Sequence, residues 1–279
     1  MRESSVPAPC RSRSMTLAST YDSSSAVAEF YDCVALYADR GDIEFYVAEA
    51  RASAGLVLEL GCGTGRILIP AARAGAEVVW LDLSENMLER CRVKLASENV
   101  SVIGRVGLVS SSMVNFSLGR KFSLITIPFR GFQHLLETSE QLECLDAVAR
   151  HLSPGGRLIL DCFQVKPEAM HHPAWQDEKE DSPETLLPDG RTLRRTSRVA
   201  AFHRERQVND IEIVWYVTHA DGVKERLVWS VPLRYFFRYE VEHLLARAGL
   251  RLTAVYGNFD CSPLAADSPE MIFVAEKPA

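Results

Sequence analysis

Three glycines at alternate positions, directly after a short apolar run, restrict the fold of this chain more than any other feature. The apolar run is Leu56–Leu60, and the glycines are Gly61, Gly63 and Gly65. A short apolar run of this kind is typical of a strand that is buried on both faces. Glycine accepts positive φ angles and lets a ligand approach the backbone closely. The pattern therefore predicts a buried strand that ends in a ligand-binding turn.

A second buried strand is predicted over 77–83, after a helix that ends at Gly75. Asp82 lies near the carboxyl end of this strand. In an open parallel sheet, ligands bind at the carboxyl ends of the strands. We therefore expect the glycine turn and the Asp82 carboxylate to face the same ligand.

The spacing of the glycines distinguishes between two kinds of ligand. It is G-x-G-x-G, and Arg66 stands where a dinucleotide-binding turn, G-x-G-x-x-G, has its third glycine. Glu59 lies just before the first glycine, and Asp82 follows on the next strand. Together these residues resemble the first two motifs of the class I S-adenosylmethionine-dependent methyltransferases. The alternatives are a different cofactor on a similar sheet, or a degenerate fold that binds none.

The resemblance implies how the cofactor is held. In the family, the glycine turn wraps the methionine end of S-adenosylmethionine, and the acid on the second strand binds the ribose hydroxyls. Glu59 would then orient the methionine amino group, and Ser112 with Met113 would contact the adenine. Ser112 departs from the family pattern, which has Asp there, and Ser123 replaces an Asp on the fourth strand. The expected cofactor-binding residues are Glu59, Gly61, Cys62, Gly63, Gly65, Asp82, Leu83, Met87, Ser112, Met113, Ile127 and Tyr37.

Later segments extend the resemblance to the whole fold. Further core strands are predicted over 100–109, 121–129, 157–163, 250–256 and 271–276. The family fold is α/β, a doubly wound, mostly parallel seven-stranded sheet of the Rossmann-like type. Segment 164–190 is expected to be irregular, whereas 191–237 alternates like antiparallel strands around the turn Asp221-Gly222. We expect these strands to form an insertion that covers the active site.

This organisation divides the chain into four parts. They are a disordered tail over 1–24, a helical lid with the cofactor-binding core over 25–163, the substrate-covering insertion over 164–237, and a C-terminal helix with a strand hairpin over 238–279.

Aromatic residues indicate where a substrate would bind. In the family, tyrosines of the lid close over the cofactor and the substrate; the alternative is that they only dock the lid on the sheet. His134 follows the fourth strand at the expected methyl-transfer centre and is a candidate general base, or else it starts or caps the next helix. The expected substrate-contacting residues are Tyr21, Tyr31, Phe129, Arg130, Phe132, Trp215, Arg234, Tyr235 and Phe259.

Composition limits the partners. The formal net charge of −6 argues against a broad nucleic-acid surface, and no apolar stretch is long enough for a membrane helix. The arginines between 191 and 206 are interpreted as a solvated sheet face, with binding of an acidic substrate or RNA as the alternative. The seven cysteines form no disulfide or zinc pattern, which fits a reducing cytoplasm. His171 and His172 lack a third ligand at suitable spacing, so we expect no metal.

These observations favour a cytoplasmic S-adenosylmethionine-dependent methyltransferase, a monomer or a homodimer, that acts on a small organic molecule. It would transfer a methyl group to nitrogen or oxygen, less readily to sulfur or carbon, and release S-adenosylhomocysteine. One alternative is an NAD-type oxidoreductase, which Arg66 disfavours. A non-catalytic binding module, or a methyltransferase acting on RNA or protein, are the others.

Overall fold

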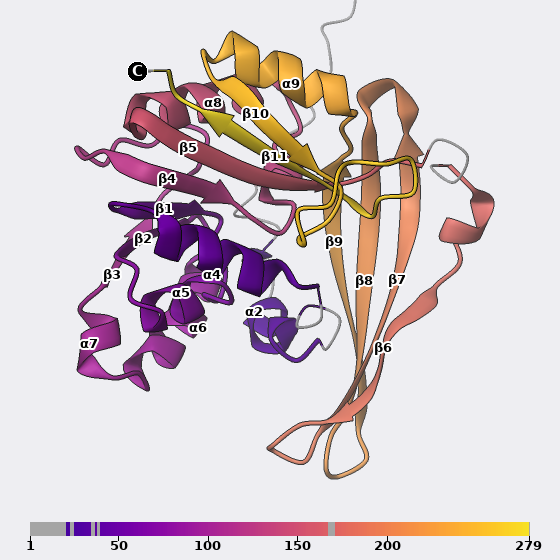
Figure 1. Ribbon diagram of the computed structural model, residues 1–279. Coiled ribbons are helices and arrows are strands. Elements are labelled where there is room, and N and C mark those ends of the chain that lie inside the picture. Colours follow the sequence, from indigo (N-terminus) through magenta and orange to yellow (C-terminus); the bar gives the residue numbers. More distant parts are fainter. Residues whose placement is uncertain (1–20, 23–24, 35–36, 38–39, 167–170, 279) are drawn as a thin grey trace, which may run out of the picture.

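A seven-stranded sheet forms the centre of the structure, with the strand order β10-β11-β5-β4-β1-β2-β3 (Figure 1). The computed structural model describes residues 21–22, 25–34, 37, 40–166 and 171–278. Strands β1 to β5 run parallel, whereas β11 is antiparallel to both β5 and β10. This is the predicted doubly wound, mostly parallel sheet. Its strands are β1 Val57–Leu60, β2 Val78–Asp82, β3 Val106–Ser110, β4 Phe122–Ile127, β5 Leu152–Phe163, β10 Arg251–Tyr256 and β11 Glu270–Glu276.

Helices cover both faces of this sheet, because its central strands are apolar on both faces. Trp80 and Val78 of β2 pack towards one group of helices, whereas Val79 and Leu81 pack towards the other. The first group is α4 Asp42–Ala52, α5 Leu68–Arg73 and α6 Glu85–Ala96; the second is α8 Thr138–His151 and α9 Arg238–Arg247. No helix in the described part of the chain is long and apolar enough to cross a membrane.

The third strand is shorter than predicted. Residues Val100–Ile103 form the short helix α7, and β3 begins only at Val106. Asn99 precedes this helix in an extended conformation, and the amide of Gly104 donates to the Val100 carbonyl at its end. Val100 is 85% exposed, which a buried strand would not allow. The prediction was wrong here because a mostly apolar segment of four residues suits a helical turn as well as a strand.

A second sheet of four antiparallel strands has the order β6-β7-β8-β9. The strands β8 Val208–Thr218 and β9 Lys224–Arg234 flank the predicted Asp221-Gly222 turn, where Gly222 has a φ of 86°. The other two are β7 Thr192–His203 and β6 Lys179–Leu186. Strand β6 corrects the expectation that 164–190 is irregular: its polar sequence shows no alternation, but it pairs with β7 at the edge of the sheet.

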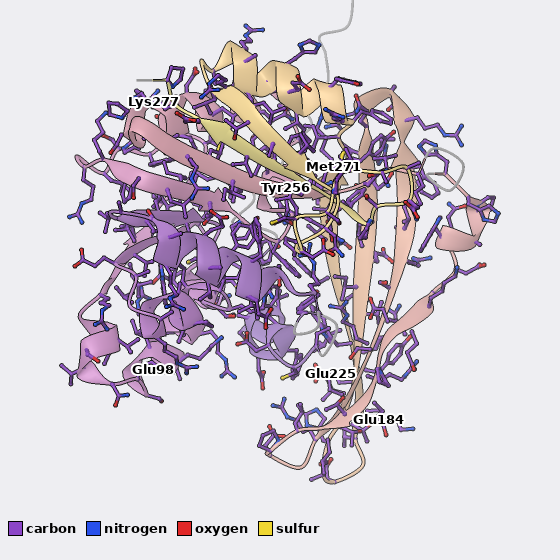
Figure 2. All side chains as sticks on the ribbon, in the orientation of Figure 1. Glu98, Glu184, Glu225, Tyr256, Met271 and Lys277 are labelled. Carbon is purple, nitrogen blue, oxygen red and sulfur yellow. The ribbon has the colours of Figure 1, made fainter. Side chains whose placement is uncertain are left out.

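The two sheets meet near the carboxyl end of β10 and the start of β11. Figure 2 shows Tyr256 and Met271 at this junction, whereas Glu184 and Glu225 lie towards the far tip of the second sheet. The inner face of the second sheet packs on α2, Ser25–Tyr31, through Trp215 and Trp229. The predicted tail, 1–24, lies outside the described residues except for Tyr21 and Asp22.

Candidate active site

The glycine turn follows β1, and each of its glycines has a positive φ angle: 73° at Gly61, 54° at Gly63 and 79° at Gly65. A Cβ atom at Gly65 would lie 2.8 Å from the Cys91 sulfur, so this glycine lets α6 pack closely against the turn. At Gly63, no atom of the described residues other than its chain neighbours lies within 4 Å of the corresponding position. The backbone at Gly63 therefore faces open space, as a ligand-binding turn requires.

Asp82 lies against this turn, as the sequence predicts. Its carboxylate accepts hydrogen bonds from the Gly63 amide, at 2.7 Å, and from the Ser84 amide, at 2.9 Å. Ser84 is the N-cap of α6 and accepts a hydrogen bond from the Met87 amide. The ends of β1 and β2 thus form one polar edge of the sheet.

Glu59 is the acidic group at this edge with the fewest hydrogen-bond partners. Its side chain is buried, and its Oε2 has no hydrogen-bond partner in the described part of the chain. Burial raises the pKa of Glu59 well above its ordinary value. Nearby Arg66 does not pair with it, because the guanidinium donates to both carboxylate oxygens of Asp42 and to the Tyr37 carbonyl. A buried, unpaired carboxyl group is suited to receive a cationic ligand.

The other predicted cofactor residues lie around this edge, and their contacts with a cofactor stay predictions. The Ser112 hydroxyl accepts a hydrogen bond from the Val114 amide and so shapes the turn after β3. Met113, Met87, Cys62 and Ile127 are buried, and Leu83 directly follows β2. Ser123 is remote from them: its hydroxyl forms a hydrogen bond with the hydroxyl of Ser53.

The loop after β4 has an unusual backbone. Phe129 and Arg130 have φ angles of 54° and 64°, although neither is a glycine. Such left-handed residues cost roughly 1–2 kcal/mol each and persist only where the surroundings hold them. Both backbone amides donate to the carboxylate of Asp161, at 2.8 and 3.1 Å. The loop continues directly into the short 3-10 helix η1, Gly131–His134.

His134 ends η1 and faces the N-terminal segment. Its Nε2 lies 3.0 Å from the Tyr21 hydroxyl. Burial lowers the pKa of His134 to about 4, so the imidazole is neutral at pH 7. The alternative that His134 starts or caps the next helix is wrong, because α8 begins at Thr138 with Glu137 as its N-cap.

Hydrogen bonds connect the N-terminal segment to both cofactor motifs, the glycine turn and the turn after Asp82. The Asp22 carboxylate accepts hydrogen bonds from the Ser84 hydroxyl and the Asn86 amide, just beyond Asp82. The Asp32 carboxylate accepts from the Thr64 hydroxyl of the glycine turn, at 2.6 Å, and from Lys94, at 3.0 Å. Sequence reasoning missed both anchors, because carboxylates in a polar segment give no distinctive local signal.

A cavity of about 650 Å³ lies between the lid, the loop after β4 and the inner face of the second sheet. Its walls include Trp229, Ile211 and Val231 from that sheet. Seven of the residues predicted for substrate binding, cofactor binding or catalysis lie on its walls: Tyr21, Tyr31, Tyr37, Phe129, Arg130, His134 and Tyr235.

Four predicted substrate-contacting residues do not line this cavity. Phe132 is fully buried and packs on Phe236 in the core. Trp215 is buried farther along the sheet, against Phe30. The guanidinium of Arg234 donates to backbone carbonyls and to Glu240, and Phe259 packs on the helix α4. The alternation of the strands is correct, but it does not reveal how far along a strand the cavity extends.

The arginines of the second sheet do not all belong to a solvated face. Arg195 is buried at the cavity wall, where it pairs with Asp181 at 2.8 Å and donates to the Tyr37 hydroxyl. Arg194 instead lies on the more exposed face, over the ring of Tyr216. The expectation of a solvated face was therefore wrong for Arg195.

Several known proteins resemble this chain in sequence. A family model described as "Methyltransferase domain" matches residues 57–156. The dTDP-3-amino-3,4,6-trideoxy-alpha-D-glucopyranose N,N-dimethyltransferase of Streptomyces venezuelae is 30% identical over 222 residues, which cover 79% of this chain and 85% of that enzyme. The chain belongs to the S-adenosylmethionine-dependent methyltransferases. The cypemycin N-terminal methyltransferase of a Streptomyces species is 29% identical, over 79% of this methyltransferase and 82% of that relative.

A solved structure agrees with this assignment. CalS10, an amino pentose methyltransferase from Micromonospora echinaspora with bound S-adenosylmethionine, matches with a TM-score of 0.65 and 26% identity, over 85% of this chain and 91% of that one. The predicted fold, enzyme class and S-adenosylmethionine cofactor are therefore confirmed. The alternative functions, an NAD-type oxidoreductase and a non-catalytic binding module, are therefore excluded.

The residues of this methyltransferase fit that cofactor. The open backbone at Gly63 leaves room for a ligand, and the unpaired Glu59 carboxyl group suits a cationic group such as the ammonium of S-adenosylmethionine. Asp82 supplies carboxylate oxygens at the adjacent strand end. The assignment of each residue to one part of the cofactor stays a prediction.

Proposed function

We propose that this methyltransferase methylates an amine nitrogen of a small organic molecule that binds in the cavity between the two sheets. The sulfonium of S-adenosylmethionine supplies the electrophilic methyl group. The task of the protein is then to hold the acceptor in line with that group and to exclude water. Within the described residues, the rings of Tyr31, Tyr37 and Phe129 form an apolar wall suited to this task.

The observation that carries the choice of nitrogen is the weak base at the cavity wall. An imidazole whose pKa is lowered to about 4 cannot ionise an alcohol or a phenol at neutral pH. A neutral amine needs no such base, because its lone pair is already nucleophilic. We infer that the Tyr21 hydroxyl donates to His134 and accepts an N–H hydrogen of the amine, which orients the nitrogen lone pair.

The related enzymes support the same choice. By their names, one relative is an N,N-dimethyltransferase of a dTDP-amino sugar, and the other is an N-terminal methyltransferase of cypemycin. A cavity of about 650 Å³ is large enough for an amine of either kind.

The test is a methyl-acceptor panel with matched pairs. Each pair offers the same carbon skeleton with an amino group or with a hydroxyl group, and includes amino sugars, short peptides with free or acetylated N-termini, and alkyl amines. Formation of S-adenosylhomocysteine and the mass of the product are measured. We expect methylation of the amino members only. Methylation of the hydroxyl members, or of acetylated peptides alone, would contradict the proposal.

Cofactor binding is measured separately by calorimetric titration with S-adenosylmethionine, S-adenosylhomocysteine and NAD. We expect the first two to bind in the micromolar range and NAD not to bind. Because this measurement needs no acceptor, a missing acceptor in the panel is not mistaken for a protein that fails to bind its cofactor.

A further inference from the structure

Two successive non-glycine residues with positive φ angles mark the loop that carries the cavity wall. Elsewhere in the described part of the chain, Gln207 and Cys261 are the only other non-glycine residues in this backbone region. Both of those lie outside the cavity wall, whereas Phe129 and Arg130 lie on it. A strained backbone at a reaction site points to a group that holds it in place.

That group is Asp161. It lies on β5, in the otherwise apolar stretch before Phe163, and its side chain is fully buried. One carboxylate oxygen accepts the Phe129 amide at 2.8 Å, and the other accepts the Arg130 amide at 3.1 Å. The carboxylate thus spans two consecutive N–H groups, which is how a negative charge favours a left-handed turn.

Asp161 is itself held by two further groups. The Tyr46 hydroxyl donates to it at 2.7 Å, and the Arg40 guanidinium donates at 3.2 Å. Arg40 also donates to Glu270 at 2.7 Å, and Glu270 accepts from Arg130 at 2.9 Å. The carboxylate is therefore fixed from β5, from α4 and from the segment before α4.

The loop that Asp161 holds sets both sides of the reaction site. The Phe129 ring lies edge-on to Tyr37, with a centroid distance of 4.8 Å, and the guanidinium of Arg66 lies 4.5 Å from its centre. Immediately after Arg130 the chain enters η1, which ends at His134. A change in the φ angles at Phe129 and Arg130 would therefore move both the aromatic wall and the imidazole.

We propose that Asp161 is a positioning residue for methyl transfer: by accepting the Phe129 and Arg130 amides it fixes the loop that aligns the acceptor. This rests on the proposed binding of the acceptor in this cavity, but not on the acceptor atom being nitrogen. Within the described residues, the hydrogen bonds of Asp161 reach neither the glycine turn nor Asp82, so we expect its replacement to change kcat and not cofactor affinity.

The first variant is Asp161→Asn, which keeps the shape but replaces one acceptor oxygen by a donor. We expect kcat to fall at least about tenfold, which corresponds to about 1.4 kcal/mol, while the Kd of S-adenosylmethionine changes less than about threefold. Tyr46→Phe is the matched control: it removes a hydrogen bond to the same carboxylate but leaves both amide bonds, so kcat should stay within about threefold of the parent.

A second comparison separates positioning from a general structural effect. Arg130→Gly and Arg130→Ala both remove the guanidinium, but only glycine accepts the positive φ angle without strain. Asp161→Asn should therefore reduce kcat less in the Arg130→Gly background than in the Arg130→Ala background. An equal reduction in the two backgrounds would overturn the proposal.

Hydrogen exchange of segment 128–134 gives a readout that needs no acceptor. We expect the Phe129 and Arg130 amides to be protected in the parent and in Tyr46→Phe, and to exchange at least about tenfold faster in Asp161→Asn. Asp161→Glu, which keeps the charge but moves the carboxylate, serves if the asparagine variant does not fold, and it should show the same loss. Unchanged protection in a folded variant would overturn the proposal, whatever the acceptor.

Discussion

Single residues at this site differ in whether their charge is matched. Three arginines, Arg40, Arg66 and Arg130, pair with three carboxylates, Asp42, Asp161 and Glu270. The charges of this network, which is buried except at Arg130, balance without Glu59, whose pKa is raised by burial. We therefore expect the Glu59 carboxyl group to bind the cofactor, and cofactor binding to depend on pH as a result.

We expect S-adenosylmethionine binding to release a proton from Glu59 over the pH range below its raised pKa. In the free protein the neutral carboxyl group is favoured there, whereas a bound ammonium group favours the carboxylate. Affinity should therefore increase with pH up to the raised pKa and then level off. Calorimetry in two buffers with different ionisation enthalpies measures the released proton, with Glu59→Gln as the control. Identical apparent enthalpies in both buffers would argue against this role.

The neutral state of His134 predicts that the stability of the fold also depends on pH. Its folded pKa is about 4, below the ordinary 6.5. Between these values the unfolded chain binds more protons than the folded one, so the free energy of unfolding decreases as the pH falls from 6.5 to 4. The contribution of His134 is at most about 1.4 kcal/mol per pH unit.

Denaturant unfolding at several pH values in this range measures that slope. His134→Gln cannot take up the proton, so its stability should decrease less steeply than that of the parent. Parallel curves for the two proteins would show that the imidazole is not buried as described.

At the scale of elements, the lid is held by its hydrogen bonds to the two cofactor motifs. Asp32→Asn removes the charge that Lys94 and Thr64 contact at the glycine turn. A partly exposed pair of this kind contributes about 1 kcal/mol, so we expect the Kd of S-adenosylmethionine to increase roughly fivefold.

The control for this variant is Glu89→Gln, which lies on α6, the helix that also carries Lys94. Within the described residues, Glu89 forms an ion pair with exposed Arg92 alone, and its change should leave the Kd unaltered. Calorimetric titration compares the two variants with the parent. An unchanged Kd for Asp32→Asn would mean that the Asp32 contacts do not support cofactor binding.

Elements with a strong local pattern were predictable from the sequence. The apolar strands β1 and β2, the glycine turn and the Asp221-Gly222 hairpin all carry their signal within a few residues. The helix α7 and the strand β6 do not: the first is too short for periodicity, and the second is polar and depends on pairing with β7.

The site shows the same division. The cofactor residues belong to local motifs, whereas the cavity wall joins Tyr21, Phe129 and Tyr235 from three distant segments. The sequence gives one indication of the role of Asp161: a carboxylate inside an apolar strand requires buried partners. Its side-chain partners could not be found in the same way, because Arg40 and Tyr46 are 121 and 115 residues away from it in the sequence and come close only in the folded protein.

At the scale of the whole molecule, the substrate cavity belongs to neither sheet alone. Its outer wall is the inner face of β8 and its neighbours, so its size can be changed without touching the cofactor motifs. Ile211→Trp should fill part of the cavity and increase the KM of the acceptor at least about fivefold, with the Kd of S-adenosylmethionine unchanged.

Val228→Trp is the matched control for this prediction. Val228 is 46% exposed and neighbours Trp229, so its side chain points to the opposite face of the same sheet. Steady-state kinetics with an acceptor from the panel, together with calorimetry, compare the two variants. Equal KM values would show that the acceptor binds elsewhere.

The position of β11 between β5 and β10 has a consequence for biosynthesis. β5 ends at Phe163, but its antiparallel neighbour begins only at Glu270. While the ribosome makes the residues between them, the hairpins of the second sheet can form locally, whereas the apolar edge of β5 stays without its neighbour. Such an edge can pair with another nascent chain. The nascent enzyme is therefore most exposed to misassembly after its catalytic motifs are complete.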